Sequence, residues 1–265
     1  LTVRGLQDTV QSLHYTQYYE DVSVSFRPRS QTVTDVVVSV KEQNTGRFMM
    51  GGGVSSDGDV FARVSYSEIN FDISNFPTFR GGGQRLNVSV HAGMDITSFN
   101  VSFTEPHIYD SDYSFSIALF RNEYERNTYT DVRYGGTISF GKKLADHLRG
   151  KIGYTYQHVT IEDVEADAAT SVKLDEGDHD LGCLSLGFSY RDLDNPYIPS
   201  TGWDAGLDVF LYNELLGSDY DFYKASLSAA RYIRIYTTEA DAHHVLLMHT
   251  KVGHMKEMGD TEEVP

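Results

Sequence analysis

The chain has 265 residues, 40% of them hydrophobic, and a formal net charge of −16 at pH 7. This length fits one large β domain, and the acidic excess argues against nucleic-acid binding, which needs a basic face. No run of eighteen apolar residues occurs, so we expect no transmembrane helix. The composition is compatible with a transmembrane β-barrel, because the strands of such a barrel alternate apolar and polar residues and keep the mean hydropathy low. The single Cys183 excludes an internal disulfide bond.

Residues 1–42 differ in pattern from the rest of the chain. Helical spacing relates three apolar residues near the start: Leu6, Val10 and Leu13. The segments 22–26 and 33–40 then alternate in polarity on the two sides of a turn. We therefore predict a helix, a strand, a turn and a second strand, the end of a small α/β module. Leu1 starts inside this unit without an initiator Met or a signal peptide, so we expect the chain to be a fragment.

A long series of strands follows Gly46. Period-two alternation predicts about eleven strands, most of them long enough to cross a membrane when tilted. Their cores lie near 47–54, 60–70, 84–92, 96–104, 114–122, 132–141, 150–160, 181–191, 203–212, 220–235 and 244–255. The sequence therefore predicts a mainly β fold with a large antiparallel sheet.

Alternation assigns two faces to these strands. The apolar face is predicted to contain Leu86, Val88, Val90, Phe99, Val101, Phe103, Phe115, Ile117, Leu119, Leu184, Leu186, Phe188, Leu207 and Val209. The other face is mainly Ser, Thr, Asn and Gly, which suits the wet lumen of a barrel and also the solvated surface of a soluble β-sandwich or adhesin. Connections favour the membrane barrel, because the longest one, 161–180, is acidic and alternates with shorter turns on the opposite side.

The segment 188–209 is the most informative hairpin. Two alternating strands flank a turn whose shape we assign to Asp192, Pro199 and Gly202. Each proline of the strand region falls in a predicted turn, as expected for a residue that lacks a backbone donor.

Five pieces, in order, resemble the BamA family of outer-membrane assembly factors. They are 41–46 entering the first strand, 69–72 closing the second, 80–84 opening the third, 101–106 ending the fourth, and the hairpin with 190–192 and 199–202. The resemblance implies the end of the last POTRA module at 1–42, followed at 43–265 by the first part of a sixteen-stranded outer-membrane β-barrel, truncated near its sixth outer loop.

The resemblance also implies a function. Members of the family fold and insert client proteins into the outer membrane of Gram-negative bacteria, with the N-terminal module in the periplasm and without enzymatic chemistry. The implied partners are outer-membrane lipid and lipopolysaccharide, unfolded clients and accessory lipoproteins, with no nucleic acid. The alternative is a related TamA-like factor or a two-partner secretion translocator. No catalytic constellation, metal site or cofactor is predicted.

The resemblance implies a seam between the first and last strands of the barrel. We therefore place the lateral gate at the first strand: Phe48, Met49, Met50, Gly51, Gly52, Gly53 and Val54. Glycine weakens strand order, and a free strand edge can template another strand. The competing interpretation is that the glycines only permit curvature or a bulge. The junction between module and barrel is assigned to Glu42, Asn44, Thr45 and Gly46.

Overall fold

The computed structural model describes residues 3–30, 33–54, 60–238 and 242–259. The N-terminal unit consists of α1 (Val3–Thr16), β1 (Tyr19–Pro28) and β2 (Thr34–Glu42), with β1 and β2 paired antiparallel. Val22 of β1 is buried in this unit. Among the described residues, no helix is both long and apolar enough to cross a membrane.

Within the described residues, eleven strands form one antiparallel sheet in strict neighbour order, which confirms the predicted fold class. The strands are β3 (Gly46–Val54), β4 (Val60–Phe71), β5 (Gln84–Gly93), β6 (Ile96–Glu105), β7 (Tyr113–Glu125), β8 (Thr130–Ala145), β9 (Leu148–Glu162), β10 (Gly177–Leu193), β11 (Gly202–Tyr212), β12 (Phe222–Thr237) and β13 (His243–Glu257). Each strand therefore pairs with its neighbours in sequence.

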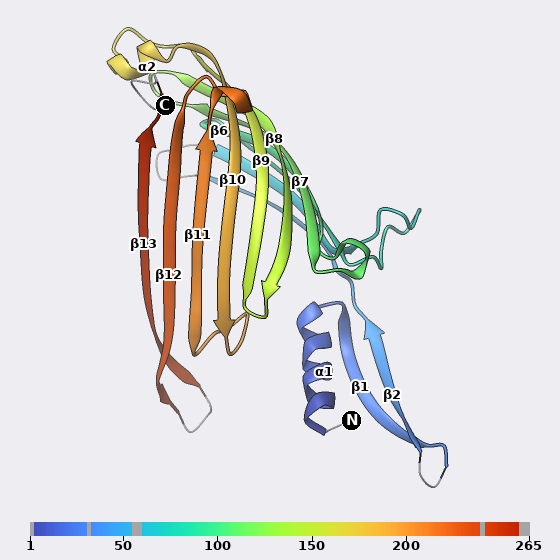
Figure 1. Ribbon diagram of the computed structural model, residues 1–265. Helices are drawn as coiled ribbons and strands as arrows, with labels where there is room; N and C mark the ends of the chain where they lie inside the picture. Colours follow the sequence, from blue (N-terminus) through green and yellow to red (C-terminus); the bar gives the residue numbers. More distant parts are fainter. Residues whose placement is uncertain (1–2, 31–32, 55–59, 239–241, 260–265) are drawn as a thin grey trace.

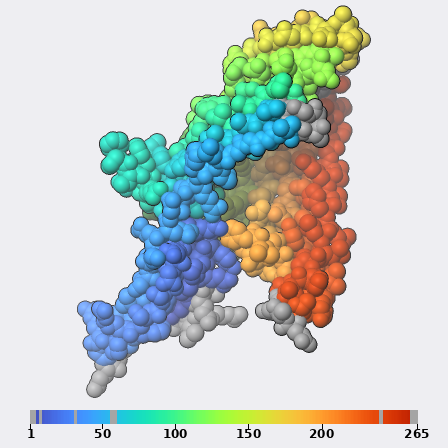
Figure 2. Space-filling view, turned by 180° about the vertical axis from the view of Figure 1, so that it is seen from behind, coloured from blue at the N-terminus to red at the C-terminus, as the bar shows by residue number. Residues whose placement is uncertain are grey.

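The sheet curves strongly, so that β3 to β6 lie behind β10 to β12 in Figure 1. The space-filling view shows the resulting hollow, with the N-terminal unit below it (Figure 2). We call the end of the sheet next to this unit the inner rim. The turns 72–83, 106–112 and 194–201 belong to the inner rim, and the connection with the short helix α2 (Thr170–Leu174) belongs to the opposite, outer rim.

The strand register confirms the predicted division into two faces. Val88 pairs with Val101, and Val101 pairs with Leu119, so these apolar residues share one face. The polar face lines the hollow, because the cavity there is bordered by Arg85, Ser114 and Lys151. The apolar face is therefore the outward one, and an outward apolar band with a polar interior is the arrangement of a membrane barrel.

Several strands extend further toward the outer rim than the sequence pattern predicts. β7 continues to Glu125, β8 starts at Thr130, and β10 starts at Gly177. Charged residues in these extensions pair along their own strand: Arg133 holds Asp131 at 2.7 Å in β8. Backbone pairing does not require apolar side chains, so the strands continue past the apolar band into water.

Candidate functional site at the first strand

Strand β3 has a free edge. Its register with β4 runs from Gly46 opposite Glu68 to Val54 opposite Val60, and within the described residues β4 is the only strand that pairs with it. An edge strand presents a row of unpaired backbone N–H and C=O groups that another chain can pair with. The edge of β3 is therefore available for strand addition.

The side chains of β3 are also exposed. Phe48, Met50 and Val54 lie on the outward face, where Met50 is 77% exposed, and Met49 lies exposed on the opposite face. Met is long and flexible and adapts to varied apolar surfaces. Both faces beside the free edge thus present adaptable apolar contacts.

The three glycines of β3 are not equivalent. A Cβ on Gly51 would meet nothing within 4 Å, whereas a Cβ on Gly52 would lie 2.9 Å from the carbonyl oxygen of Phe61. A Cβ on Gly53 would lie 3.2 Å from the Phe61 ring, which covers this glycine from the neighbouring strand. Gly52 and Gly53 therefore permit close approach of β4, and Gly51 alone leaves an unfilled position. The curvature interpretation accounts for Gly52 and Gly53, and the gate interpretation, which rests on Gly51, stays a prediction.

The inner end of β3 is fixed by polar contacts. The Asn44 side-chain oxygen accepts hydrogen bonds from Arg80 Nη2 at 3.0 Å and from the Gly46 backbone N–H at 3.4 Å. Arg80 also approaches the Glu68 carboxylate, which is buried beside Gly46. The start of β3 is thus fastened to β4 and to the turn 72–83.

Two further junction residues lie where the N-terminal unit meets the sheet. Glu42 is the last residue of β2 and pairs with Tyr19, and Thr45 is buried just before β3. The backbone N–H of Gln43 donates to the Tyr18 carbonyl at 3.0 Å. The sequence analysis assigned the junction to Glu42, Asn44, Thr45 and Gly46. It did not include Glu68 and Arg80, because their proximity depends on the fold-back of the turn 72–83.

The turn 194–201 is organised around Asp194. One carboxylate oxygen accepts hydrogen bonds from the backbone N–H groups of Asn195, Ser200 and Thr201 at 2.8–3.0 Å. The other oxygen pairs with Arg234 Nη2 at 3.1 Å and accepts the Ser200 hydroxyl. Asp194 thereby connects this turn to β12.

The three turn residues singled out in the sequence lie around this cluster. Gly202 has φ of +127°, and a Cβ there would lie 2.0 Å from the Asp192 carbonyl oxygen, so the position requires glycine. Asp192 lies across from Trp203 in the register, and its carboxylate is 3.8 Å from His147. Pro199 lies within the turn itself.

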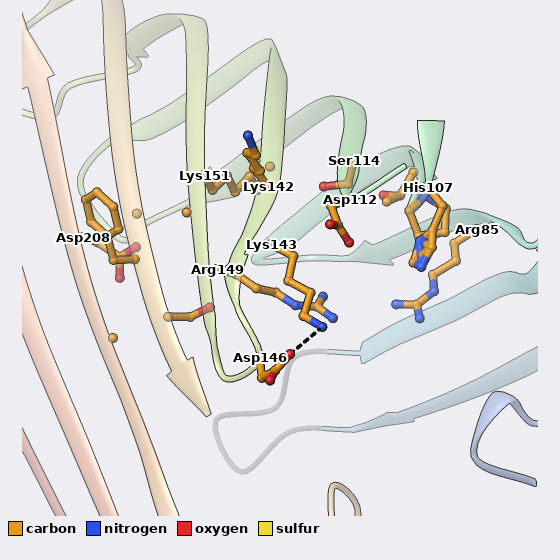
Figure 3. Close-up of a pocket in the computed structure, with 18 residues that line it drawn as sticks. Arg85, His107, Asp112, Ser114, Lys142, Lys143, Asp146, Arg149, Lys151 and Asp208 are labelled. Atoms are coloured by element: carbon orange, nitrogen blue, oxygen red, sulfur yellow. Dashed lines mark ion pairs between the residues drawn. The ribbon is translucent and has the colours of Figure 1, made fainter. Parts of the chain in front are cut away.

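Charged residues occupy the hollow near the inner rim (Figure 3). A cavity of about 680 Å³ lies there, and the side chains of Arg85, Lys143 and Arg149 extend into it toward Asp112 and Asp146. Lys143 pairs with Asp146 at 3.2 Å. The concave face is therefore a hydrated surface and not a packed core.

These features define a class of protein. A curved antiparallel sheet with an outward apolar band and a polar concave face is a membrane β-barrel wall, here preceded by a small α/β unit. Residues 78–265 match the Omp85 superfamily domain. The chain belongs to the Omp85 superfamily.

Comparisons with curated proteins agree with this assignment. The outer membrane protein assembly factor BamA of Neorickettsia risticii is 28% identical over 208 residues, 77% of this chain and 27% of the relative. BamA of Nitratidesulfovibrio vulgaris is 25% identical over 260 residues, 96% of this chain and 31% of the relative. The chain thus spans about a third or less of the length of these relatives. Outer envelope protein 80 of Arabidopsis thaliana chloroplasts is 25% identical over 161 residues, 56% of this chain and 22% of the relative.

Solved structures share the fold. BamA from Haemophilus ducreyi lacking POTRA domains 1–3 superposes with a TM-score of 0.67 at 22% identity, over 99% of this chain and 51% of that one. CdiB from Acinetobacter baumannii gives a TM-score of 0.54 at 12% identity, over 94% and 46% of the two chains. The family and the BamA relatives assign the chain to the outer membrane of a Gram-negative bacterium.

Proposed function

We propose that this chain is the gate-bearing part of an outer-membrane β-barrel assembly factor, which folds and inserts client outer-membrane proteins at the free edge of β3. The two BamA relatives carry this activity in their names. Client insertion needs no enzymatic chemistry, because strand pairing and the exclusion of lipid from the paired backbone supply the driving force. Its partners are unfolded clients, outer-membrane lipid and lipopolysaccharide, and accessory lipoproteins.

The free edge of β3 is the observation that carries the proposal. An unpaired backbone N–H or C=O costs several kcal/mol in hydrocarbon. A client strand that adds to this edge satisfies those groups, as in other cases of β-strand addition, whereas lipid chains offer no hydrogen-bond partners. The edge therefore favours a peptide strand over lipid as its neighbour.

The contrast between the two ends of β3 supports a direction of opening. Contacts of Asn44 with Arg80 and Gly46 hold the inner end. The outer half contains Gly51, which contributes no side-chain packing and lowers strand order. A strand fastened at one end and weak at the other opens from the weak end, so a client would pair first near Gly51 to Val54.

Site-specific photo-crosslinking in the full-length protein tests the proposal. A photo-reactive residue replaces Met50 on β3, and the matched control replaces Leu207 on β11, which also faces outward but is paired on both sides. During client insertion into liposomes, we expect client crosslinks at position 50 and only lipid crosslinks at position 207.

Equal client crosslinking at both positions would contradict insertion at this edge. The translocator alternative makes a different prediction, because a secreted substrate would pass along the polar face. A third photo-reactive position at Asn100, which lies on that face, would then give the strongest crosslinks. The likeness to CdiB reflects the fold and does not favour that alternative.

A further inference from the structure

A second pocket opens on the outward face at the inner rim, beside the start of β3. It has a volume of about 450 Å³ and is lined by Tyr66, Glu68, Phe71, Thr78, Phe79 and Arg80. Tyr66 and Glu68 come from β4, and the other residues come from its end and from the turn 72–83, which folds back over it. The Phe79 carbonyl accepts the Asp72 N–H at 2.9 Å and holds this fold-back in place.

One wall of the pocket carries a buried carboxylate. The Glu68 side chain is 1% exposed, and its Oε1 accepts the Asn70 backbone N–H at 3.0 Å. Its Oε2 is 3.4 Å from the Tyr66 hydroxyl and 3.6 Å from Arg80 Nε, both long for hydrogen bonds. Oε2 therefore keeps capacity for a closer donor.

The opposite charge is supplied by Arg80. One guanidinium nitrogen, Nη2, donates to Asn44 at 3.0 Å, and the side chain is 52% exposed. A guanidinium carries five N–H donors and suits phosphate oxygens. The pocket therefore presents an anion and a cation side by side, each with hydrogen-bonding capacity to spare.

The remaining wall is aromatic and continues into the outward apolar band. The Phe71 ring stacks on Phe79 with centroids 5.7 Å apart and meets the edge of Phe103 at 6.3 Å. Phe103 pairs with Leu86 in the apolar band. One step further toward the inner rim, Gln84 and Glu105 form a polar pair at 2.9 Å. The pocket thus lies where the apolar band gives way to polar side chains.

The turn 72–83, which contributes Thr78, Phe79 and Arg80 to the pocket, also exposes apolar side chains. Phe76 is 79% exposed and Ile73 is 63% exposed. Aromatic girdles mark the interfaces of membrane barrels. This part of the inner rim is therefore built to lie in the interfacial layer of the inner leaflet.

We propose that this pocket binds one phospholipid of the inner leaflet whose headgroup carries a primary ammonium, the phosphatidylethanolamine class. The phosphate binds Arg80, the ammonium donates to Glu68 Oε2, and the acyl chains run across Phe71 and Phe103. A zwitterion matches the paired charges of the pocket. An anionic phosphatidylglycerol offers no ammonium to Glu68 Oε2, and the quaternary ammonium of phosphatidylcholine has no N–H to donate.

The position of the pocket gives bound lipid a structural consequence. Glu68 pairs with Gly46 in the register, and its Oε2 would lie 2.9 Å from a Cβ on Gly46. The headgroup thus rests on the first residue pair between β3 and β4. Lipid bound there stabilises the inner end of β3. This effect does not depend on which substrate uses the free edge of the strand.

Native mass spectrometry of the full-length protein tests the proposal. Protein released from micelles with added phosphatidylethanolamine, phosphatidylglycerol or phosphatidylcholine is compared with three variants. Arg80→Gln removes the residue that binds the phosphate. Thr78→Trp fills the pocket from an exposed position and leaves both charged residues, Glu68 and Arg80, in place. Arg63→Gln is the matched control, because Arg63 lies on the opposite face of β4.

We expect wild type to retain phosphatidylethanolamine about tenfold better than the other two lipids, as the one additional charge-assisted hydrogen bond to Glu68 would give. Arg80→Gln should lower the retention of all three lipids, Thr78→Trp should lose the preference, and Arg63→Gln should keep it. Equal retention of the three lipids by wild type would overturn the proposal. So would an unchanged preference in Thr78→Trp, whose folding is checked by its heat-modifiable gel mobility.

Discussion

The Tyr197 hydroxyl donates a hydrogen bond of 2.7 Å to the backbone carbonyl of Tyr15, across 182 positions of sequence. The two rings also meet, with centroids 5.9 Å apart. Tyr197 lies in the turn 194–201, and Tyr15 lies in the last turn of α1. The contact therefore ties the N-terminal unit to the inner rim on the side of the sheet away from β3.

Loss of this contact should loosen the N-terminal unit. Tyr197→Phe removes a hydrogen bond worth roughly 0.5–1.5 kcal/mol, and Tyr197→Ala also removes the ring contact. Spin labels on Ser12 and Asp146 should report a broader distance distribution, most strongly for Tyr197→Ala. Tyr109→Phe is the control, since Tyr109 is 99% exposed in a neighbouring inner turn. An unchanged distribution in Tyr197→Ala would show that other contacts hold the unit.

Substitutions in the glycine run should act in opposite directions. Gly51→Val adds a β-branched side chain into open space and should strengthen pairing, on a propensity scale that spans about 1 kcal/mol. Gly52→Val pushes a side chain against the Phe61 carbonyl and should weaken pairing. Hydrogen exchange of β3 amides should slow in the first variant and accelerate in the second. If both variants shift exchange the same way, the distinction drawn between the two glycines is wrong.

A charge on the outward face should destabilise the barrel far more than one on the concave face. Val101→Arg puts a cation in the apolar band and should cost about 2–4 kcal/mol near mid-membrane. Asn100→Arg, one residue earlier on the polar face, should cost much less. Urea unfolding of the full-length protein in lipid vesicles measures both. Equal losses would argue against a lipid-facing apolar band.

The Asp194 cluster should make the inner rim sensitive to acid. Burial by itself would raise the pKa of this carboxyl, but hydrogen bonds from Ser200 and Thr201 outweigh burial and hold the pKa well below its usual range. A lowered native pKa stabilises the fold fully above the unfolded value of about 4, and the contribution is lost as pH falls toward the native pKa.

The matching measurement compares wild type with Asp194→Asn between pH 6 and pH 2. The stability difference between them should be constant above about pH 5 and shrink below about pH 4, because only wild type has the lowered carboxyl pKa to lose. Thermal unfolding in detergent gives this difference at each pH. A difference that stays constant down to pH 2 would mean that the charge of Asp194 contributes no stability.

Strand positions and faces followed from the sequence, and strand ends did not. Alternation located Val88, Val101 and Leu119 on one face because a lipid-facing band imposes a period of two. The same rule does not apply beyond the band, where Glu125 and Gly177 still pair through their backbones. The period-two pattern therefore ends with the apolar band, whereas the strands themselves extend beyond it into water.

Local sequence patterns could not predict which polar side chains come together in the fold. The sequence does not distinguish Asp194 from nearby Asp192 as the residue that organises the turn, and its partner Arg234 lies 40 positions away. Glu68 likewise depends on Arg80, which only the fold-back of the turn brings near. The three glycines of β3 are equivalent in the sequence pattern. Phe61 distinguishes them in the fold, because it lies close to Gly52 and Gly53 but not to Gly51. In each case the role of the residue depends on which group, distant in sequence, lies close to it in the fold.

Strict neighbour order has a consequence for the free edge. Every pairing in this sheet closes a short loop, whereas any further partner for β3 must come from far along the chain or from another molecule. Closing a ring of roughly 200 residues instead of roughly 10 costs about 2–3 kcal/mol more in loop-closure entropy. The free edge of β3 is thus costly for the chain to satisfy from within itself, a handicap set by topology and independent of which residues line the strand.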